Sequence, residues 1–228
     1  MELLDLTKNL VNIGSVTGHE KACVEYVHDY LTHLGFQAEL MPVSRDRANV
    51  FVCWGRPDVV LSTHLDTVPP FFPASEDADY IYGRGSCDAK GIAAAQVTAA
   101  WRLKEEGVMD FALLFLVGEE TTSDGAREAN LHACGSRYII NGEPTENKLV
   151  TGTKGALRLD VRGRGKMAHS AYPQLGESAI DKLLDVLADL RKLPLPASPV
   201  LGPSTLNIGV ISGGAPPTWS PMKPRPKS

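Results

Sequence analysis

Apolar and polar residues follow each other along the chain with two different periods. Where apolar residues recur every three to four positions, or where small apolar residues dominate, the sequence predicts helices. These stretches are residues 20–34, 91–103, 123–134 and 178–190. Short runs rich in β-branched and aromatic residues predict strands. The runs lie at residues 37–42, 49–54, 59–63, 111–117, 138–141, 156–162 and 205–211.

The order of these elements predicts the fold class. Strands alternate with helices up to about residue 154, which is typical of a sheet-centred α/β domain. The runs at 111–117 and 138–141 are apolar enough to be buried strands. Beyond this point, strand, helix and strand predict a smaller α+β unit. We therefore expect two domains, residues 1–154 and 155–215, and a disordered proline-rich tail over 216–228.

Composition and charge exclude several classes of protein. Lys and Arg number 23 against 27 Asp and Glu, so no strong positive field attracts nucleic acid or an anionic membrane. No apolar run approaches the roughly 20 residues that span a bilayer, and residues 1–10 carry no basic-then-apolar leader. Four scattered cysteines form no CxxC pair, which argues against disulfides and a cysteine zinc site. We expect a cytoplasmic globular protein.

Four clusters of acidic or histidine residues lie where predicted strands end. They are STHLDT with His64 and Asp66, GRGSCDAKG with Asp88, VGEET with Glu119 and Glu120, and NGEPT with Glu143. Each cluster alone also has an ordinary explanation: a surface turn, a helix N-cap at Asp88, a solvated acidic loop, or an exposed glutamate. Because ligands at successive strand ends converge on one edge of a sheet, the four together predict a metal site.

Two of these clusters also suggest which residues bind the metal and which act beside it. His64 and Asp66 point to the same side of an extended chain, which suits a metal ligand and its orienting carboxylate. Glu119 and Glu120 face different ways, so that one can bind metal while the other faces the reacting water. A dinucleotide-binding loop is disfavoured, because GRGSCD breaks the GxGxxG order.

Five strings of the sequence form an ordered series: STHLDTVP, YGRGSCDAKGIAA, VGEETTSDGA, NGEPT with TKGA, and KMAHSAYP. From about residue 5 to 215, the chain thereby resembles the dizinc aminoacylase/carboxypeptidase family. That family includes acetylornithine deacetylase, succinyl-diaminopimelate desuccinylase and several exopeptidases. The resemblance implies two zinc ions per active site, with cobalt or manganese as substitutes, and a homodimer.

The resemblance also assigns metal ligands by their position in the motifs. It implies that His64 binds one zinc, Asp88 bridges both, Glu143 completes the first site and Glu120 binds the second. It implies a cis peptide bond after Asp88.

Catalytic roles follow from the same resemblance. Glu119 is similar to the family's general base, and Asp66 to the carboxylate that orients the His64 ring. His169 is similar to the lid histidine that reaches the active site of a partner subunit. Glu143 is shared by the deacylases and carboxypeptidases, whereas the aminopeptidases usually have Asp at this position. The implied reaction is zinc-dependent hydrolysis of an N-acyl amino acid or a dipeptide, next to a free carboxylate.

The chain departs from the family pattern at its C-terminal end. Family members supply a late histidine to the second zinc after a complete lid, whereas this sequence stops at Ser228 within the lid. We therefore expect one tight zinc, a weak second site, and impaired activity.

The sequence of the tail suggests a frameshift. Codons AAC GTG GTC CCC GAT GAA GCC GAG encode the family-like NVVPDEAE and, read one base later, give TWSPMKP, the string Thr218–Pro224.

Two alternative functions remain open. One is a non-catalytic, truncated remnant of such an enzyme. The other is a magnesium-dependent phosphohydrolase, against which His64 argues because magnesium prefers oxygen ligands.

Overall fold

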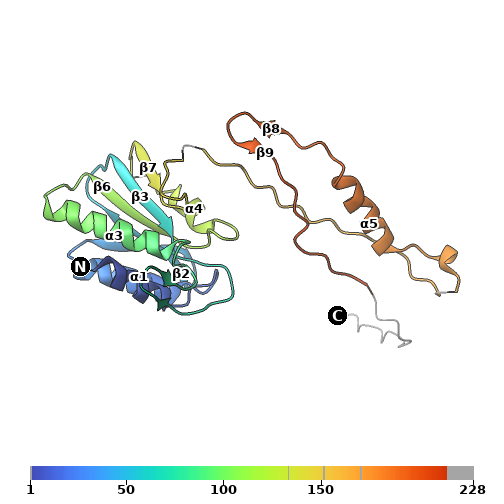
Figure 1. Ribbon diagram of the computed structural model, residues 1–228, viewed down its shortest axis with the longest axis horizontal. Helices are drawn as coiled ribbons and strands as arrows, with labels where there is room; N and C mark the ends of the chain where they lie inside the picture. Colours follow the sequence, from blue (N-terminus) through green and yellow to red (C-terminus); the bar gives the residue numbers. More distant parts are fainter. Residues whose placement is uncertain (1, 133, 151, 170, 215–228) are drawn as a thin grey trace. The chain divides into compact units, whose positions relative to one another are not determined.

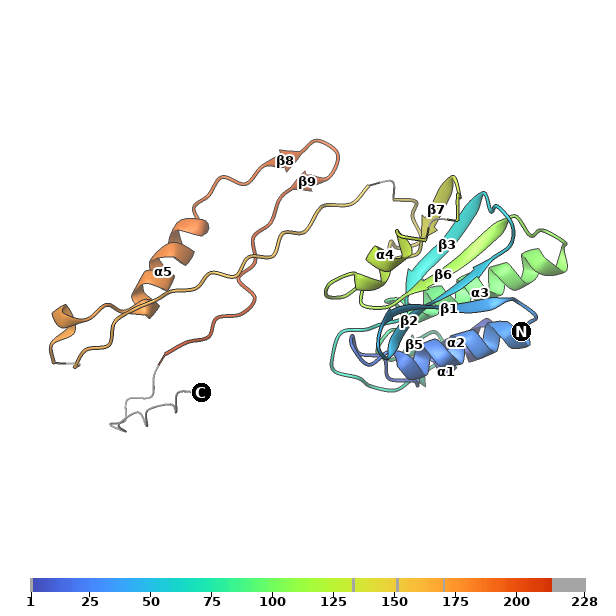
Figure 2. The same ribbon diagram turned by 180° about the vertical axis from the view of Figure 1, so that it is seen from behind.

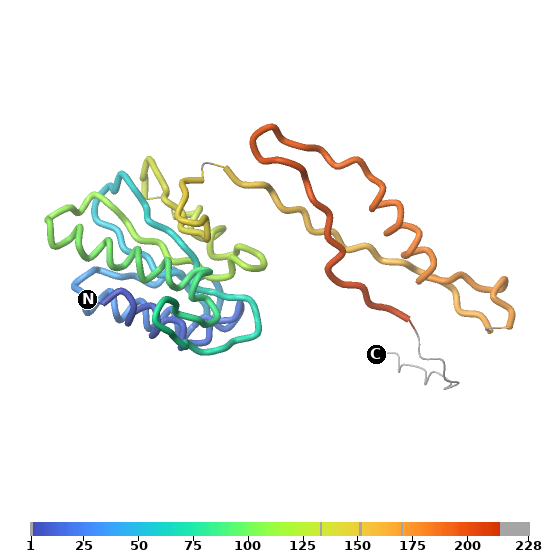
Figure 3. Tube along the Cα trace, in the orientation of Figure 1, coloured from blue at the N-terminus to red at the C-terminus, as the bar shows by residue number. Residues whose placement is uncertain are grey.

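The computed structural model describes residues 2–132, 134–150, 152–169 and 171–214. The chain divides into two compact units, Met1–Lys148 and Leu149–Ser228 (Figure 1 and Figure 3). The tail predicted at 216–228 lies outside the described residues. Within the described part of the chain, no helix is both long and apolar enough to cross a membrane.

The first unit is built on a five-stranded sheet with strand order β1-β2-β6-β3-β7 (Figure 1 and Figure 2). Its strands are β1 (Ala38–Ser44), β2 (Arg47–Cys53), β3 (Val59–His64), β6 (Phe111–Leu116) and β7 (Tyr138–Asn141). β2 is antiparallel to β1 and β6, whereas β3 runs parallel to both β6 and β7. Three neighbouring strands therefore end at the same edge of the sheet, and the loops that follow them meet there. A separate short pair joins β4 (Ser75–Glu76) to β5 (Ile81–Tyr82).

Four helices accompany this sheet: α1 (Leu3–Val11), α2 (Lys21–His33), α3 (Lys90–Glu105) and α4 (Asp124–Ala129). The helices predicted over 20–34 and 91–103 are confirmed. The helix predicted over 123–134 is shorter and ends at Ala129. α1 was not among the predicted helices, although its buried residues lie at helical spacing: Leu6, Thr7, Leu10 and Val11.

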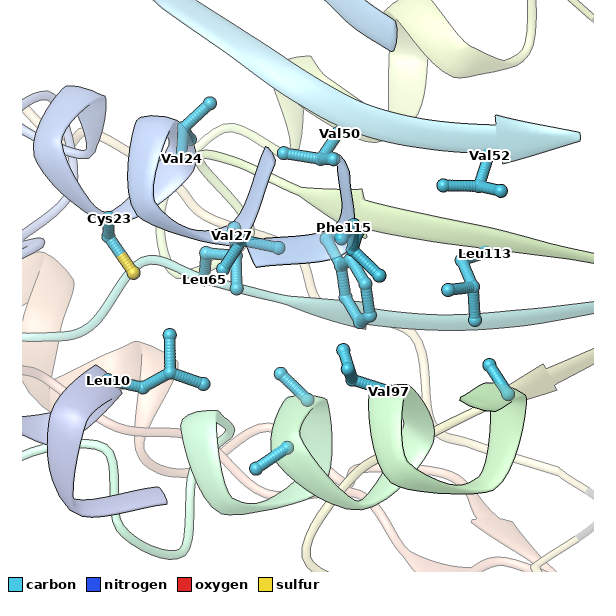
Figure 4. Close-up of a cluster of buried hydrophobic side chains, with 14 of the residues drawn as sticks. Leu10, Cys23, Val24, Val27, Val50, Val52, Leu65, Val97, Leu113 and Phe115 are labelled. Atoms are coloured by element: carbon cyan, nitrogen blue, oxygen red, sulfur yellow. The ribbon is translucent and has the colours of Figure 1, made fainter. Parts of the chain in front are cut away.

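One cluster of buried side chains joins α1, α2 and α3 to the sheet (Figure 4). Val50 and Val52 of β2 lie opposite Phe115 and Leu113 of β6, and all four are fully buried. Val97 of α3 belongs to the same cluster. Burial of each such side chain stabilises the fold by about 1.5–3 kcal/mol. This core therefore fixes the sheet whose edge carries the polar clusters.

β7 is found where a buried strand was predicted, but the prediction of burial is wrong. Ile139 and Ile140 are 64% and 58% exposed. Among the described residues, β7 pairs with β3 alone and stands at the edge of the sheet. An apolar run cannot by itself distinguish an edge strand from a central one, which explains the error.

The second unit contains α5 (Ala179–Leu190), the 3-10 turn Pro173–Leu175, and the short strands β8 (Ala197–Ser198) and β9 (Gly202–Pro203). The helix predicted over 178–190 is confirmed. Ser178 caps its first turn, because its hydroxyl accepts a hydrogen bond from the Asp181 amide at 3.1 Å.

The strands predicted at 156–162 and 205–211 are not formed in the described part of this unit. Apolar residues of both segments, among them Leu159 and Ile208, instead line a groove beside Ile180 and Leu183 of α5. A strand requires a hydrogen-bonded neighbour as well as a favourable sequence. The alternating pattern is present, but the described residues provide these segments with no strand partner.

Candidate metal centre

The predicted ligands come together at the sheet edge where three parallel strands end. His64 is the last residue of β3, Glu119 and Glu120 follow β6, and Glu143 follows β7. Asp88 arrives from the loop before α3. Sequence positions far apart therefore meet because the parallel strands deliver them to one edge.

Three of these side chains form a compact group. His64 Nε2 lies 2.9 Å from Asp88 Oδ1 and 3.9 Å from Glu143 Oε2. One ligand atom from each of the three residues lies within 4.8 Å of the other two. His64 is buried, whereas the Asp88 and Glu143 side chains are 50% and 37% exposed, so the group is open to solvent on one side. One imidazole and two carboxylates make a donor set that suits a catalytic zinc ion.

The His64 ring is held through its other nitrogen. Nδ1 lies 2.9 Å from the main-chain oxygen of Asp66 and 3.5 Å from the Asp66 carboxylate. The main-chain oxygen, rather than the carboxylate, is therefore the closer acceptor for an Nδ1 proton. This arrangement fixes the ring so that Nε2 faces the Asp88 carboxylate, the side on which a metal ion would be shared by the two.

The Asp66 carboxylate has a different set of partners. It is fully buried and accepts hydrogen bonds from the Thr17 hydroxyl at 2.8 Å and from the amides of Glu119 and Glu120 at 3.0 and 3.2 Å. Burial raises the pKa of Asp66, but the His64 ring and these donors outweigh burial and hold the pKa below its usual range. Asp66 therefore stays ionised and ties the loop after β6 to the loop after β3.

The other ionisable groups show that negative charge is crowded at this edge. Burial, followed by the charge of Asp88, raises the pKa of Glu120. Burial also raises the pKa of Glu143, against the opposing effects of His64 and Asn141. Burial lowers the pKa of His64, but the carboxylates of Asp66 and Glu143 outweigh it and raise the pKa to about 9. A divalent cation would compensate this surplus of negative charge.

Glu119 and Glu120 reach the edge without joining the group of three. The Glu119 side chain is exposed and that of Glu120 is half-buried. Among the described residues, the one group of at least three potential ligands this close together is His64, Asp88 and Glu143. Glu120 is close enough to Asp88 for the charge of Asp88 to raise its pKa.

His169 belongs to the second unit. Its Nδ1 accepts a hydrogen bond from the Ala171 amide at 3.1 Å, and its ring lies 5.9 Å from the Tyr172 ring. The side chain is exposed on that unit. These contacts describe a local loop and assign no chemistry to His169.

The segment around Asp88 is anchored by a lysine that was not among the predicted site residues. The Asp88–Ala89 peptide bond is cis, as the resemblance implies. Asp88 does not cap α3, since Ala89 occupies the N-cap position without a side-chain hydrogen bond. Lys90 is fully buried and donates through Nζ to the main-chain oxygens of Leu10, at 3.0 Å, and Ile13. The sequence held one indication of this role: Lys90 is a charged residue at the start of a helix rich in small apolar residues, which are predicted to be buried.

Comparisons with known proteins identify similar sequences. Residues 60–222 match the family described as peptidase family M20/M25/M40. A peptidase M20 domain-containing protein of Schizosaccharomyces pombe is 46% identical, with 93% of this chain and 56% of the relative covered. A probable carboxypeptidase of Aspergillus clavatus is 39% identical, with 93% of this chain and 54% of the relative covered. The chain thus spans about half the length of the curated relatives it matches.

Solved structures share the fold. A tripeptidase from Staphylococcus aureus aligns with a TM-score of 0.63 at 23% identity, covering 82% of this chain and 55% of that chain. A metallo-carboxypeptidase from Sulfolobus solfataricus aligns with a TM-score of 0.52 at 19% identity, covering 62% of this chain and 37% of that chain. The sheet-centred α/β class is confirmed. Because the family match extends over most of the chain and agrees with the ordered motifs, this protein belongs to the peptidase family M20/M25/M40.

Proposed function

We propose that this chain carries the metal-binding part of a zinc-dependent amidohydrolase. Its substrate would be an N-acyl amino acid, from which the acyl group is removed, or a dipeptide cleaved next to its free carboxylate. This proposal rests mainly on the group that His64, Asp88 and Glu143 form at one edge of the sheet. The similar probable carboxypeptidase of A. clavatus and the tripeptidase of S. aureus support an amide or peptide bond as the target.

Zinc fits the donor set better than magnesium, because a buried imidazole is one of the ligands. When bound, zinc lowers the pKa of water towards about 7 and polarises a carbonyl group. His64 would bind through Nε2, since Nδ1 faces the main-chain oxygen of Asp66. Asp88 and Glu143 would supply carboxylate oxygens, and cobalt or manganese are expected to replace zinc.

Glu119 is the proposed general base. Its amide is fixed on the Asp66 carboxylate, its side chain is exposed, and its charge is close enough to Glu143 to raise the pKa of that residue. From there the carboxylate would accept a proton from the attacking water and return it to the leaving nitrogen. His169 is the proposed source of positive charge for the developing oxyanion, reaching a partner subunit in a homodimer. A cytoplasmic location is part of the same proposal.

We further propose that the chain binds one zinc tightly and a second weakly. Among the described residues, His64, Asp88 and Glu143 form a close group for the first site, whereas Asp88 and Glu120 are the proposed ligands of the second. Zinc titration against a competing chelator should therefore give a stoichiometry close to one. Glu143→Gln should weaken this binding at least about tenfold, since it removes one of three ligands, whereas Glu105→Gln at the exposed end of α3 should leave it unchanged. Two tight equivalents per chain would contradict the proposal.

Hydrolysis of N-acetylated amino acids and dipeptides by the zinc-loaded chain tests the activity. Glu119→Gln should abolish hydrolysis without loss of zinc, because the base does not hold the metal. A chain that binds zinc but hydrolyses none of these substrates would favour the second candidate, a non-catalytic remnant. The observation behind this second candidate is that the chain spans about half of its relatives.

A further inference from the structure

We propose that Thr17 is a positioning residue of the metal centre. Its hydroxyl holds the Asp66 carboxylate, which binds the loop of Glu119 and Glu120 and lies beside the His64 ring. The inference rests on the proposed metal site for its functional meaning, but its structural basis is independent of that site.

The Asp66 carboxylate accepts three hydrogen bonds, lies close to the His64 ring, and has no access to solvent. Oδ2 accepts hydrogen bonds from the Thr17 hydroxyl at 2.8 Å and from the Glu120 amide at 3.2 Å. Oδ1 accepts from the Glu119 amide at 3.0 Å and lies 3.5 Å from His64 Nδ1. Because Asp66 is fully buried, bulk water cannot replace a lost donor. The Thr17 hydroxyl is therefore one of three donors that fix the carboxylate, and the one of the three that belongs to a side chain.

Thr17 is itself held firmly beside this carboxylate. Val16 forms a parallel bridge with Thr67, the Thr17 amide donates to the Thr67 oxygen at 3.2 Å, and the Thr67 amide donates to the Ser15 oxygen at 3.0 Å. The Ser15 hydroxyl donates to the Leu65 oxygen at 2.6 Å. Residues 15–17 thus run along residues 65–67 and present the Thr17 hydroxyl at a fixed position.

The position of Asp66 matters because it connects two parts of the centre. Its main-chain oxygen lies against His64, and its carboxylate binds the loop after β6. We expect that loss of the Thr17 hydroxyl frees the carboxylate to rotate and so weakens the hydrogen bonds that it accepts from the Glu119 and Glu120 amides. Residues that orient a ligand typically affect metal affinity by about 10- to 100-fold.

The test compares Thr17→Val, which removes the hydroxyl at nearly constant shape, with Thr17→Ser, which retains it. Thr7→Val is the control for loss of a threonine hydroxyl. Thr7 is buried, whereas Thr17 is half-buried, and the Thr7 hydroxyl bonds within α1 to the Leu3 oxygen at 2.9 Å. Two properties are measured on the full chain: the cobalt dissociation constant from the visible spectrum, and hydrogen exchange of the Glu119 and Glu120 amides without metal.

Thr17→Val should weaken cobalt binding about tenfold or more and speed exchange of both amides about tenfold. Thr17→Ser should stay within about threefold of wild type, and Thr7→Val should change neither property. The proposal would be overturned if Thr17→Val had the cobalt affinity and amide exchange rates of wild type. It would also be overturned if Thr7→Val changed both properties as much as Thr17→Val does. If Thr17→Val does not fold, Thr17→Ala is judged by the same criteria. A wild-type chain that binds no cobalt contradicts the metal site, and amide exchange then decides the role of Thr17 alone.

Discussion

Gly118 shows how closely the end of β6 is fitted to its surroundings. Its φ of +74° is a conformation that favours glycine, and a Cβ there would collide with the side chains of Asp124 and Arg47. The next residues along the chain are Glu119 and Glu120. Gly118 therefore allows the strand to turn into the loop that carries two candidate site residues.

Replacing Gly118 by Ala should destabilise the first unit more than a positive φ alone explains. Gly107 is the matched control, since its φ is +78° and a Cβ added there would meet no atom within 4 Å, so only backbone strain applies. We expect Gly107→Ala to lower the free energy of unfolding by about 1 kcal/mol and Gly118→Ala by about 2–3 kcal/mol. Urea unfolding measures both. If both variants lost the same free energy of unfolding, the added Cβ at Gly118 would not collide with its neighbours as proposed.

The contribution of single residues to the site was only partly predictable from the sequence. His64 and Glu143 stand at the ends of parallel strands, so their approach to one another follows from topology. Asp88 lies in a motif as well, but it reaches them from the loop before α3. Thr17 and Lys90 act across tertiary contacts: the Thr17 hydroxyl meets a carboxylate 49 positions away in the chain, and Lys90 binds backbone oxygens of α1 and the turn after it. Neither contact has a local pattern that periodicity or motif spacing can detect.

At the scale of elements, an ion-pair network joins β2 to two helices. Arg47 on β2 binds the buried carboxylate of Glu20, just before α2, with contacts of 2.9 and 2.7 Å. Its other terminal nitrogen binds Asp124, the first residue of α4. Burying one partner alone is costly, so the three side chains favour one arrangement of strand and helices.

This network predicts a pH dependence of stability. Burial raises the pKa of Asp124, but the Thr122 hydroxyl and Arg47 outweigh it and hold the pKa below its usual range. The folded-state pKa thus lies below the unfolded value of about 3.9, so the stabilisation is present above that pH and is lost as the pH falls through the folded-state pKa. Asp124→Asn should therefore lower the urea midpoint at pH 7, and the difference from wild type should narrow below about pH 4.

The control for this prediction is Asp46→Asn, in the exposed turn between β1 and β2. Its urea midpoint should stay close to that of wild type at both pH values. If the difference between Asp124→Asn and wild type is as large at about pH 3 as at pH 7, the ion pair is not the source of the stabilisation.

Elements were predictable where their signal is local. The helices over 20–34, 91–103 and 178–190 formed as expected, because in each of them apolar residues recur at the spacing that places them on one face of a helix. The strands expected at 156–162 and 205–211 did not form in the described residues, because strand formation depends on a neighbour elsewhere in the chain. The burial of β7 was misjudged for the same reason, since its edge position is a property of the whole sheet.

At the scale of the whole molecule, the two units differ in how far they bury their apolar residues. The first unit has a continuous core that includes α1, α2 and α3. In the described part of the second unit, α5 has no buried residue, and Ile180 and Leu184 are 47% and 50% exposed. Exposed apolar surface on this scale is typical of a surface that another segment covers. The stability of the chain therefore resides in the first unit.

All proposed metal ligands also lie in the first unit, which predicts that residues 1–148 fold and bind metal alone. Limited proteolysis of the full chain should remove the second unit first and leave a resistant fragment of this size. The isolated fragment should bind cobalt within about threefold of the full chain, because no proposed ligand is lost. At a cobalt concentration about 100 times the dissociation constant, the metal should stabilise both proteins by about 2.7 kcal/mol.

Folding and metal binding by the isolated fragment are expected to depend on the core of the first unit and not on the exposed edge strand β7. Because β7 presents Ile139 and Ile140 to solvent, the fragment is expected to associate at high concentration, and binding is therefore measured on dilute samples. A fragment that is unfolded when dilute, or that binds cobalt more than about tenfold more weakly than the full chain, would show that the second unit completes the metal centre. Equal binding would place the whole of the primary metal site, with its supporting Thr17 and Asp66, within residues 1–148.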